Sequence, residues 1–327
     1  MKKIAIIGSG LSGLIMAMNL KQLAKVTIFE KSKGPGGRLA TRRRDGYHFD
    51  HGAQFFTAKS MEFKNLISLM NNKKIIQRWD ARFVEIDKSQ IIRSDIWNEK
   101  FPHYVGIPSM NNIAKFLSQD LNIKFNTKVL KVSEENNFWK IYDHNGNIFK
   151  KFDWVIFAIP PQQVLEVIPK KFKYINDIKN IKMQACYSLM IGYEKEIKLS
   201  FDAAIIHGAN ISWISVNSSK PSRNQNFSIV VHSTNNWADN NIDVSDDEVK
   251  SFLLNETSKV IKIDLTNPKI IDLQRWRYAN IAKQKLLKQF IDYNQKIAVC
   301  GDWCIQGRVE SAFLSSYKTL NEIKKYI

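Results

Sequence analysis

The sequence predicts an α/β protein with two domains, one built on a parallel sheet and a second, α+β domain built on a mostly antiparallel sheet. Wholly apolar, β-branched runs at 2–8, 154–161 and 296–302 are typical of buried parallel strands. The first run ends in a glycine-bearing turn that is followed by apolar residues at helical spacing, which makes a βαβ unit. Short alternating runs elsewhere indicate strands of an antiparallel sheet.

Length and composition favour an ordered intracellular protein. The 327 residues, 44% of them apolar, suffice for a sizeable core and favour two domains. The formal net charge of +18 comes largely from lysines spread along the chain, so we expect no nucleic-acid partner. No apolar run reaches the roughly 18 residues that a membrane span needs. Three cysteines, Cys186, Cys300 and Cys304, make no disulfide framework and favour a cytoplasmic location.

The first third of the chain begins with strand 2–8, helix 11–23 and strand 25–31. A polar loop then leads to a helix at 60–72, and alternating runs at 81–87 and 89–97 are predicted as antiparallel strands. Another helix is predicted within 106–121, with Ser109 as its N-cap.

The remaining elements complete both sheets. A meander is predicted over 123–161, with a hairpin turn at Asn145-Gly146. Strands at 185–194, 211–219, 227–237 and 269–279 are assigned to the second sheet, and an amphipathic helix at 245–261 has Ser245 as its cap. The last buried strand, 296–302, precedes a terminal helix at 309–326.

The order of these elements divides each domain into segments. We expect the first domain to comprise residues 1–74, 106–161 and 286–327, and the second to comprise 75–105 and 162–285. The second domain is thus inserted twice into the first.

The turn after the first strand has the pattern G-x-G-x-x-G. Gly8 permits a tight turn, Gly10 lets the backbone approach a pyrophosphate, and Gly13 allows close helix packing, with Ser12 in the first helical turn. Glu30 ends the second strand, 20 residues after Gly10, where a carboxylate accepts hydrogen bonds from ribose hydroxyls. The pattern predicts a Rossmann-like dinucleotide-binding domain and leaves NAD and FAD open.

A second glycine cluster, "KGPGGR", favours FAD. Gly36, Gly37 and Arg38 resemble the second fingerprint of FAD enzymes of the amine oxidase and hydroxylase superfamily, in which such residues lie along the flavin diphosphate. Lys31 follows the ribose-binding acid and is a further candidate. A flexible basic loop is the alternative interpretation.

The segment "CGDWCIQGRVESAF" resembles the third FAD motif of the same superfamily. The resemblance implies that Asp302 accepts hydrogen bonds from the ribityl chain and that the helix starting near Val309 points its N-terminus at the flavin, with Glu310 and Ala312 in its first turn. A helix N-terminus stabilises the negative charge of a reduced flavin.

The two cysteines of this segment raise the alternative of a metal or redox pair. A zinc site usually has four ligands, and the six histidines are scattered along the chain without forming a matching pair. The spacing of Cys300 and Cys304 is also not C-x-x-C. We interpret both as buried small residues and expect no metal.

A set of longer motifs resembles a narrower family. The segments at 36–43, 50–58, 105–117, 230–237, 274–279 and 300–316 together resemble bacterial renalase and its close relatives. The resemblance implies a Rossmann-like FAD-binding domain with a second α+β substrate domain, and an oxidase that converts 2- and 6-dihydro isomers of NAD(P) to NAD(P)+ while dioxygen becomes hydrogen peroxide. Val129 is a further cofactor-binding candidate.

The same resemblance points to the residues nearest the substrate. It implies that Gln54 lies close to the flavin and that His232 and Trp276 position the nicotinamide ring, with Trp237 and Tyr278 as further candidates. Core packing is the alternative for the histidine and for each aromatic residue. Because hydride leaves an already neutral dihydropyridine, no catalytic base is expected. The competing functions are a flavin amine oxidase or desaturase and, in another class, a basic nucleic-acid-binding protein with structural FAD.

Overall fold

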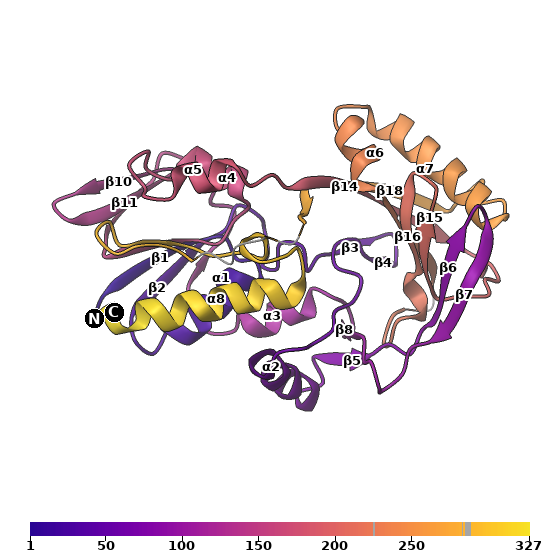
Figure 1. Cartoon of the computed structure of the whole chain (residues 1–327), viewed down its shortest axis with the longest axis horizontal. Coiled ribbons are helices and arrows are strands. Elements are labelled where there is room, and N and C mark those ends of the chain that lie inside the picture. The colour runs from indigo at the N-terminus through magenta and orange to yellow at the C-terminus, as the bar shows by residue number, and fades with distance from the viewer. Residues whose placement is uncertain (225, 283, 285–288) are drawn as a thin grey trace. The chain divides into compact units, whose positions relative to one another are not determined.

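The computed structural model describes residues 1–224, 226–282, 284 and 289–327 and divides them into two compact units. Unit 1 comprises 1–38, 114–183 and 281–327, and unit 2 comprises 39–113 and 184–280 (Figure 1). The boundaries of these units differ at three places from those of the predicted domains. The first moves from 74 to 38 because Tyr47 and Phe49 pack on Met190, Val230 and Ile270 of unit 2. The others move from 105 to 113 and from 161 to 183, and the predicted boundary at 285 falls outside the described residues.

Unit 1 is built on a six-stranded sheet with the order β19-β20-β13-β1-β2-β9. Its strands are β1 (Lys3–Ile7), β2 (Lys25–Phe29), β9 (Ile123–Lys124), β13 (Trp154–Phe157), β19 (Phe290–Asp292) and β20 (Ile297–Val299). All neighbouring pairs are parallel except β19 and β20. The apolar runs lie at its centre, where Ile4, Ile6 and Val155 are completely buried. Burial on both faces explains why these runs do not alternate.

Helices and a small meander complete unit 1. They are α1 (Leu11–Leu20), α4 (Pro161–Val167), α5 (Ile175–Lys179), α8 (Val309–Ile323), the 3-10 turns η2 (Asp302–Cys304) and η3 (Lys324–Tyr326), and the antiparallel strands β10 (Val129–Glu135), β11 (Phe138–Asp143) and β12 (Ile148–Phe152). The predicted hairpin turn joins β11 to β12, where Gly146 has a φ of +80°. Helix α3 (Asn112–Leu117) crosses the boundary between the units.

Unit 2 is built on a seven-stranded sheet with the order β18-β14-β17-β16-β15-β6-β7. Its strands are β6 (Arg82–Asp87), β7 (Gln90–Ile96), β14 (Gln184–Tyr193), β15 (Ala203–His207), β16 (Ile211–Val216), β17 (Phe227–Ser233) and β18 (Ile270–Asn280). Every neighbouring pair is antiparallel except β15 and β6. The mostly antiparallel second sheet and the α/β fold class are confirmed.

The two faces of this sheet differ. One face carries a large apolar core that includes Tyr187, Leu189 and Val231, and Figure 1 shows α6 (Asn235–Asn240) and α7 (Asp246–Ile261) beside it. The other face carries the hairpin of β3 (Thr41–Arg44) and β4 (Tyr47–Asp50). Helix α2 (Met61–Asn72), the short pair β5 (Ile76–Arg78) and β8 (Tyr104–Gly106), and the turn η1 (Asn217–Ser219) complete the unit.

Two local predictions are corrected by the structure. Residues 41–50 were predicted as a polar loop but form the β3–β4 hairpin, because Tyr47 and Phe49 alternate inward against the sheet. Ser109 does not cap a helix: α3 begins only at Asn112, and the Ser109 hydroxyl donates to Asn111 and accepts from Arg43. The predicted cap Ser245 accepts from the backbone N–H of Glu248, as expected. Within the described residues, no helix is both long enough and apolar enough to cross a membrane.

Candidate functional site

The glycines in the turn between β1 and α1 differ in their surroundings: two leave no room for a side chain, and the third faces open space. Gly8 has a φ of +100°, and a Cβ atom on Gly13 would lie 2.0 Å from the Gly8 carbonyl oxygen, so side chains are excluded at both. A Cβ atom on Gly10 would meet no atom within 4 Å. Gly10 is also the N-cap of α1 and has no side chain to accept from the first-turn N–H groups. These donors and the open space beside them suit a diphosphate.

The second glycine cluster lies directly against the first. The Gly36 N–H donates to the Ser9 carbonyl over 2.9 Å, and Gly10 and Gly36 form an isolated parallel bridge. Gly37 has a φ of +55°, which is a left-handed conformation that favours glycine. The structure therefore brings together two motifs that lie about 25 residues apart, as expected if both follow one extended ligand.

Glu30 is held at the end of β2 by three hydrogen bonds. Its Oε2 accepts from the N–H and the hydroxyl of Ser9, both over 2.8 Å, and its Oε1 accepts from the Ser32 N–H over 2.8 Å. The residue is buried, with 8% of its surface exposed. A carboxylate oxygen can accept two hydrogen bonds, so Glu30 keeps acceptor capacity for ribose hydroxyls, at Oε1 above all.

Arg38 and Asp302 join the second motif to the third. The two guanidinium nitrogens of Arg38 lie 2.9 and 2.5 Å from the two carboxylate oxygens of Asp302, which is the bidentate geometry of a strong charge-assisted pair. The sequence predicted neither this pair nor its geometry. The separate roles assigned to the two residues, on the diphosphate and on the ribityl chain, stay predictions.

The third motif packs against the first through hydroxyl groups. The Ser12 hydroxyl donates to the Ala312 carbonyl, and the Ser316 hydroxyl donates to the Ser12 carbonyl, each over 2.8 Å. Helix α8 begins at Val309 with Glu310 in its first turn, so its N-terminus lies beside the start of α1. All three FAD motifs thus lie together in unit 1, where their backbone donors and open glycine fit the cofactor.

The remaining cofactor candidates of unit 1 lie at separate places. Lys31 is exposed in the loop after β2, and Val129 is buried at the start of β10. Cys300 and Cys304 are buried free thiols next to η2, and burial raises the pKa of Cys300 to about 12 and also raises that of Cys304. Such thiols are poor nucleophiles and poor metal ligands at neutral pH.

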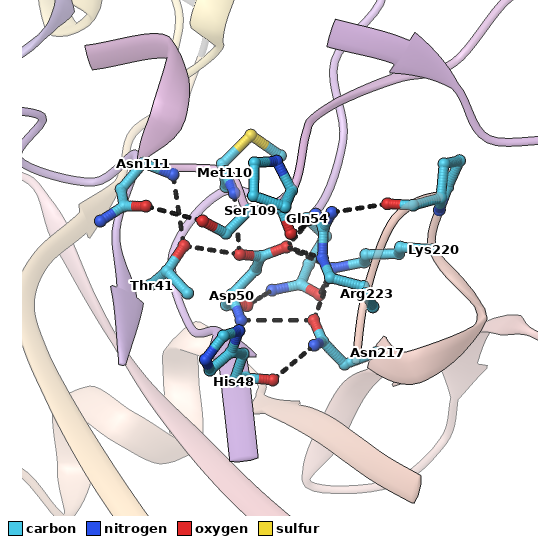
Figure 2. Close-up of polar contacts among 12 residues, drawn as sticks. Thr41, His48, Asp50, Gln54, Ser109, Met110, Asn111, Asn217, Lys220 and Arg223 are labelled. Atoms are coloured by element: carbon cyan, nitrogen blue, oxygen red, sulfur yellow. Dashed lines mark hydrogen bonds and ion pairs between the residues drawn. The ribbon is translucent and has the colours of Figure 1, made fainter. Parts of the chain in front are cut away.

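Unit 2 contains a second concentration of polar groups, centred on Asp50 at the end of β4. Its carboxylate is completely buried and accepts from Arg223 over 2.5 Å, from Thr41 over 2.7 Å and from the Met110 N–H over 3.0 Å (Figure 2). The Lys220 ammonium lies 3.7 Å away. Burial by itself raises the pKa of the Asp50 carboxyl, but Lys220 and Arg223 lower it below its ordinary value. Asp50 is therefore ionised at neutral pH and pairs with two cations.

Gln54 links this centre to His232. Its Oε1 accepts from Ser215 over 2.8 Å and from Lys220 over 3.0 Å, whereas its Nε2 donates to the Asp50 carbonyl over 2.5 Å. The same Nε2 lies 3.3 Å from His232 Nε2. Gln54, which the resemblance placed close to the flavin, and His232, which it placed at the nicotinamide ring, are therefore in direct contact although they lie 178 positions apart.

Trp276 is connected to the same place through His51. The two rings stack with centroids 5.3 Å apart at an interplanar angle of 15°, and Trp276 Nε1 donates to the His51 carbonyl over 2.9 Å. Burial, followed by Arg42, lowers the pKa of His51 to about 4, and burial, followed by Lys220, lowers that of His232 to about 3. Both imidazoles are neutral at physiological pH. We call His51, Gln54, His232 and Trp276 the His232 cluster.

Several buried polar atoms around this cluster have no partner among the described residues. They include Ser188 Oγ and Trp213 Nε1, which lie in the strands on either side of His232, and His51 Nδ1. Buried polar atoms usually find a partner, so a concentration of unpaired ones indicates a place for water or a ligand. The cluster is thus both polar and incompletely satisfied.

The other two aromatic candidates have different surroundings. Trp237 stacks on Phe252, with centroids 4.7 Å apart, within the core on the helix-covered face. Its environment therefore corresponds to the core-packing alternative. Tyr278 lies two residues after Trp276 in β18, so its side chain is on the same face of the sheet.

Lys220 and Arg223 were not predicted from the sequence, and His51 was not singled out. Lys220 is one of 49 lysines and arginines, and no local pattern marks it as buried. Its side chain has no exposed surface, and burial lowers its pKa to about 7. A signal for His51 existed, because it belongs to the "DHGAQFFTA" segment of the family resemblance.

The arginine run at 42–44 has internal partners in unit 2. Arg42 binds Asp272 over 2.9 Å and Gln274 over 2.6 Å, and Arg44 lies 3.3 Å from Asp272. These guanidinium groups therefore connect β3 to β18 through ion pairs and hydrogen bonds.

The fold and the motifs of unit 1 define an FAD-dependent oxidoreductase. Comparison with known proteins is consistent with this class: residues 6–72 match the NAD(P)-binding Rossmann-like domain family, and residues 90–323 match the flavin containing amine oxidoreductase family. Because the second match covers most of the chain, the protein belongs to the flavin containing amine oxidoreductase family, and its cofactor is FAD.

Curated relatives resemble only a short part of the chain. A 1-hydroxycarotenoid 3,4-desaturase of Flavobacterium sp. is 47% identical over 58 residues, which are 17% of this chain and 12% of the relative. A coproporphyrinogen III oxidase of Staphylococcus aureus is 43% identical over 61 residues, or 18% and 13%. A 4,4'-diapophytoene desaturase of the same species is 47% identical over 97 residues, or 26% and 19%. The chain thus matches less than a fifth of the length of each.

Solved structures share the fold over the whole chain. A putative protoporphyrinogen oxidase from Exiguobacterium sp. 255-15 has a TM-score of 0.80 and 12% identity, with 100% of this chain and 99% of the other covered. A triple mutant of putrescine oxidase has a TM-score of 0.78 and 12% identity, with the same coverage. At this identity the likeness concerns the fold alone.

Proposed function

We propose that the protein is a renalase-like FAD-dependent oxidase that converts 2- and 6-dihydro isomers of NAD(P) to NAD(P)+, with dioxygen reduced to hydrogen peroxide. The observation that carries this proposal is the His232 cluster, in which Gln54, His232 and Trp276 come together from distant parts of the chain with His51. The resemblance of the sequence had implied that Gln54 lies close to the flavin and that His232 and Trp276 position the nicotinamide ring.

The charges of this cluster favour a neutral, planar substrate over an ammonium ion. Both of its histidines are neutral, and the indole of Trp276 offers a flat apolar surface. The two carboxylates near it, Asp50 and Asp272, are already paired with arginines. Among the described residues, a protonated amine would therefore find no free carboxylate at the cluster, whereas a dihydropyridine with a carboxamide needs none.

The chemistry asks little of the protein side chains. When bound, FAD supplies the acceptor for the hydride and passes the two electrons to dioxygen. Loss of hydride turns a neutral dihydropyridine into a pyridinium cation without loss of a proton, so the neutral histidines serve for orientation and hydrogen bonding. Unit 1 holds the cofactor, and we assign the choice of substrate to the His232 cluster.

The alternative function is that of a flavin amine oxidase or a desaturase. It is favoured by family membership and by the desaturases among the partial relatives. The two functions differ in the charge of the substrate, which makes them separable by experiment.

The test is reduction of the bound flavin in the absence of oxygen. Purified FAD-loaded protein is mixed with 2-dihydro-NAD or 6-dihydro-NAD, and flavin absorbance is followed in a stopped-flow instrument. We expect bleaching within seconds, with NAD+ as product, and hydrogen peroxide once air is admitted. Ordinary 4-dihydro-NAD and a panel of primary amines and polyamines are the controls. Bleaching by an amine but not by the dihydro isomers would contradict the proposal and support the alternative.

A further inference from the structure

Lys220 is a buried cation that is attached to the His232 cluster through one amide group. Its ammonium donates to Gln54 Oε1 over 3.0 Å and to Asn217 Oδ1 over 3.1 Å (Figure 2). It also lies 5.4 Å from the centre of the Trp79 ring. Below its pKa of about 7, Lys220 is an ammonium group, which has three donors and no acceptor. The atom of Gln54 that faces Lys220 must therefore be the amide oxygen.

The other end of the Gln54 amide is fixed by acceptors. Its Nε2 lies 2.5 Å from the Asp50 carbonyl oxygen and 3.1 Å from the Gly52 carbonyl oxygen. A reversed amide would place its oxygen against these two carbonyls and its NH2 group against the ammonium of Lys220. Lys220 and the two carbonyls thus select one orientation of Gln54, in which the Ser215 hydroxyl at 2.8 Å donates to the amide oxygen.

This orientation determines which nitrogen of His232 carries the proton. The two hydrogens of Gln54 Nε2 are shared among the Asp50 carbonyl, the Gly52 carbonyl and His232 Nε2, which lies 3.3 Å away. A proton on His232 Nε2 would point at this NH2 group, which has no acceptor, so His232 Nε2 is the unprotonated nitrogen. A neutral imidazole whose Nε2 accepts carries its proton on Nδ1. His232 is partly exposed, and within the described part of the chain the hydrogen bond to Gln54 is the only one that its ring makes.

We propose that Lys220 is a positioning residue that acts through Gln54 to hold His232 as the neutral Nδ1–H tautomer, so that His232 offers the substrate a hydrogen-bond donor. The part of this statement that concerns the substrate rests on the proposed function. It adds that His232 recognises an acceptor group, such as the oxygen of a carboxamide. The unpaired Ser188 hydroxyl and Trp213 N–H in the neighbouring strands are further groups for the same polar ligand.

The tautomer can be measured without turnover. In FAD-loaded protein labelled with nitrogen-15, multiple-bond correlation spectra distinguish the protonated nitrogen of His232 from the unprotonated one. We expect Nδ1–H in the wild-type protein. Lys220→Met removes a charge-assisted hydrogen bond from Gln54 Oε1 and is expected to shift the tautomer ratio toward Nε2–H by about tenfold. The matched control is Thr41→Val, which perturbs the Asp50 carboxylate over 2.7 Å but makes no contact with Gln54 and leaves the ratio unchanged.

A second variant keeps the test decisive if Lys220→Met does not fold. Gln54→Glu has the same shape but presents an oxygen to His232, so the proton is expected to move to Nε2. An Nε2–H tautomer in the wild-type protein, or an unchanged tautomer in Gln54→Glu, would overturn the inference. An unchanged tautomer ratio in folded Lys220→Met would show that Lys220 does not position His232.

The inference and the proposed function fail in different ways. If the dihydro isomers do not bleach the flavin but the tautomer responds to Lys220→Met, the positioning role stands and the substrate is another molecule with an acceptor group. If they do bleach it, Lys220→Met is expected to raise KM about tenfold for 6-dihydro-NAD with a much smaller change in kcat, because a binding hydrogen bond is lost. An unchanged KM with an altered tautomer would overturn the substrate contact alone.

Discussion

At the scale of single residues, Asp50 is the most constrained group in unit 2. Its carboxylate has no exposed surface and balances the guanidinium of Arg223 and the ammonium of Lys220, both of which are also fully buried. Taking three charges out of water is costly, and each is tolerated only while its partners remain. Below about pH 7, where Lys220 is charged, the net charge of this trio is positive, so loss of the one carboxylate leaves two cations without compensation.

Asp50→Asn is therefore expected to lower the free energy of unfolding by about 3–5 kcal/mol, the range for breaking a buried ion pair from one side. Urea denaturation of the FAD-loaded protein followed by circular dichroism measures it. The matched control is Asp80→Asn, which breaks an exposed pair with Arg78 and is expected to cost no more than about 1 kcal/mol. Equal effects of the two substitutions would show that the buried charges do not depend on Asp50.

At the scale of elements, different glycines of the turn from β1 to α1 have different roles. Gly13 lets α1 approach the turn, because a Cβ atom there would lie 2.0 Å from the Gly8 carbonyl oxygen. Gly10 faces open space and keeps a normal φ of −65°, so nothing in the protein itself requires a glycine at that position. The element thus uses Gly13 for folding, and we assign Gly10 to the cofactor.

The two alanine variants are expected to separate these purposes. Gly13→Ala overpacks the start of α1 and is expected to cost at least about 1–3 kcal/mol of stability in the apoprotein. Gly10→Ala is expected to change apoprotein stability by less than about 0.5 kcal/mol, yet to weaken FAD binding at least tenfold, because the methyl group occupies space beside the diphosphate. Thermal denaturation of apoprotein and fluorescence titration with FAD provide the two readouts. Full FAD affinity in Gly10→Ala would contradict the assignment.

At the scale of the whole molecule, two neutral and desolvated histidines, one buried and one partly exposed, couple stability to pH. The ordinary histidine pKa is 6.5, and burial lowers that of His51 to about 4 and that of His232 to about 3 in the folded protein. Between these values the unfolded chain binds protons that the folded protein does not. The stabilising contribution is therefore complete above about pH 6.5 and is lost as the pH falls through 4 and 3.

We expect the free energy of unfolding to fall between pH 6.5 and 4, with up to about 1.4 kcal/mol per pH unit from each of these two histidines. His232→Gln is expected to reduce the slope of the free energy of unfolding against pH by the contribution of one histidine. The double variant His51→Gln/His232→Gln is expected to reduce it by the contribution of both. Urea denaturation at half-unit intervals of pH measures the slopes. Identical slopes in wild-type and double-variant protein would contradict the assignment of neutral buried rings.

An element of the fold could be predicted from the local sequence where a single physical cause, such as burial on both faces, determines the residue pattern. The buried strands that include Ile4, Val155 and Ala298 were predictable because burial on both faces gives uninterrupted apolar runs. The β3–β4 hairpin was not predictable, because the three consecutive arginines of β3 make the segment resemble a polar loop and obscure the inward alternation of Tyr47 and Phe49. The domain boundaries moved for the same reason, since such contacts join residues far apart in sequence.

The sequence by itself determined the cofactor-binding half of the protein, because a glycine turn, a second glycine cluster and a Gly-Asp turn each impose local backbone geometry that leaves a local signature. Only the tertiary structure decided the rest. It paired Arg38 with Asp302, enclosed Lys220 in a buried network and placed Gln54 against His232. These contacts depend on charge balance and desolvation among residues up to about 260 positions apart, and nothing in the immediate neighbourhood of any one residue specifies them.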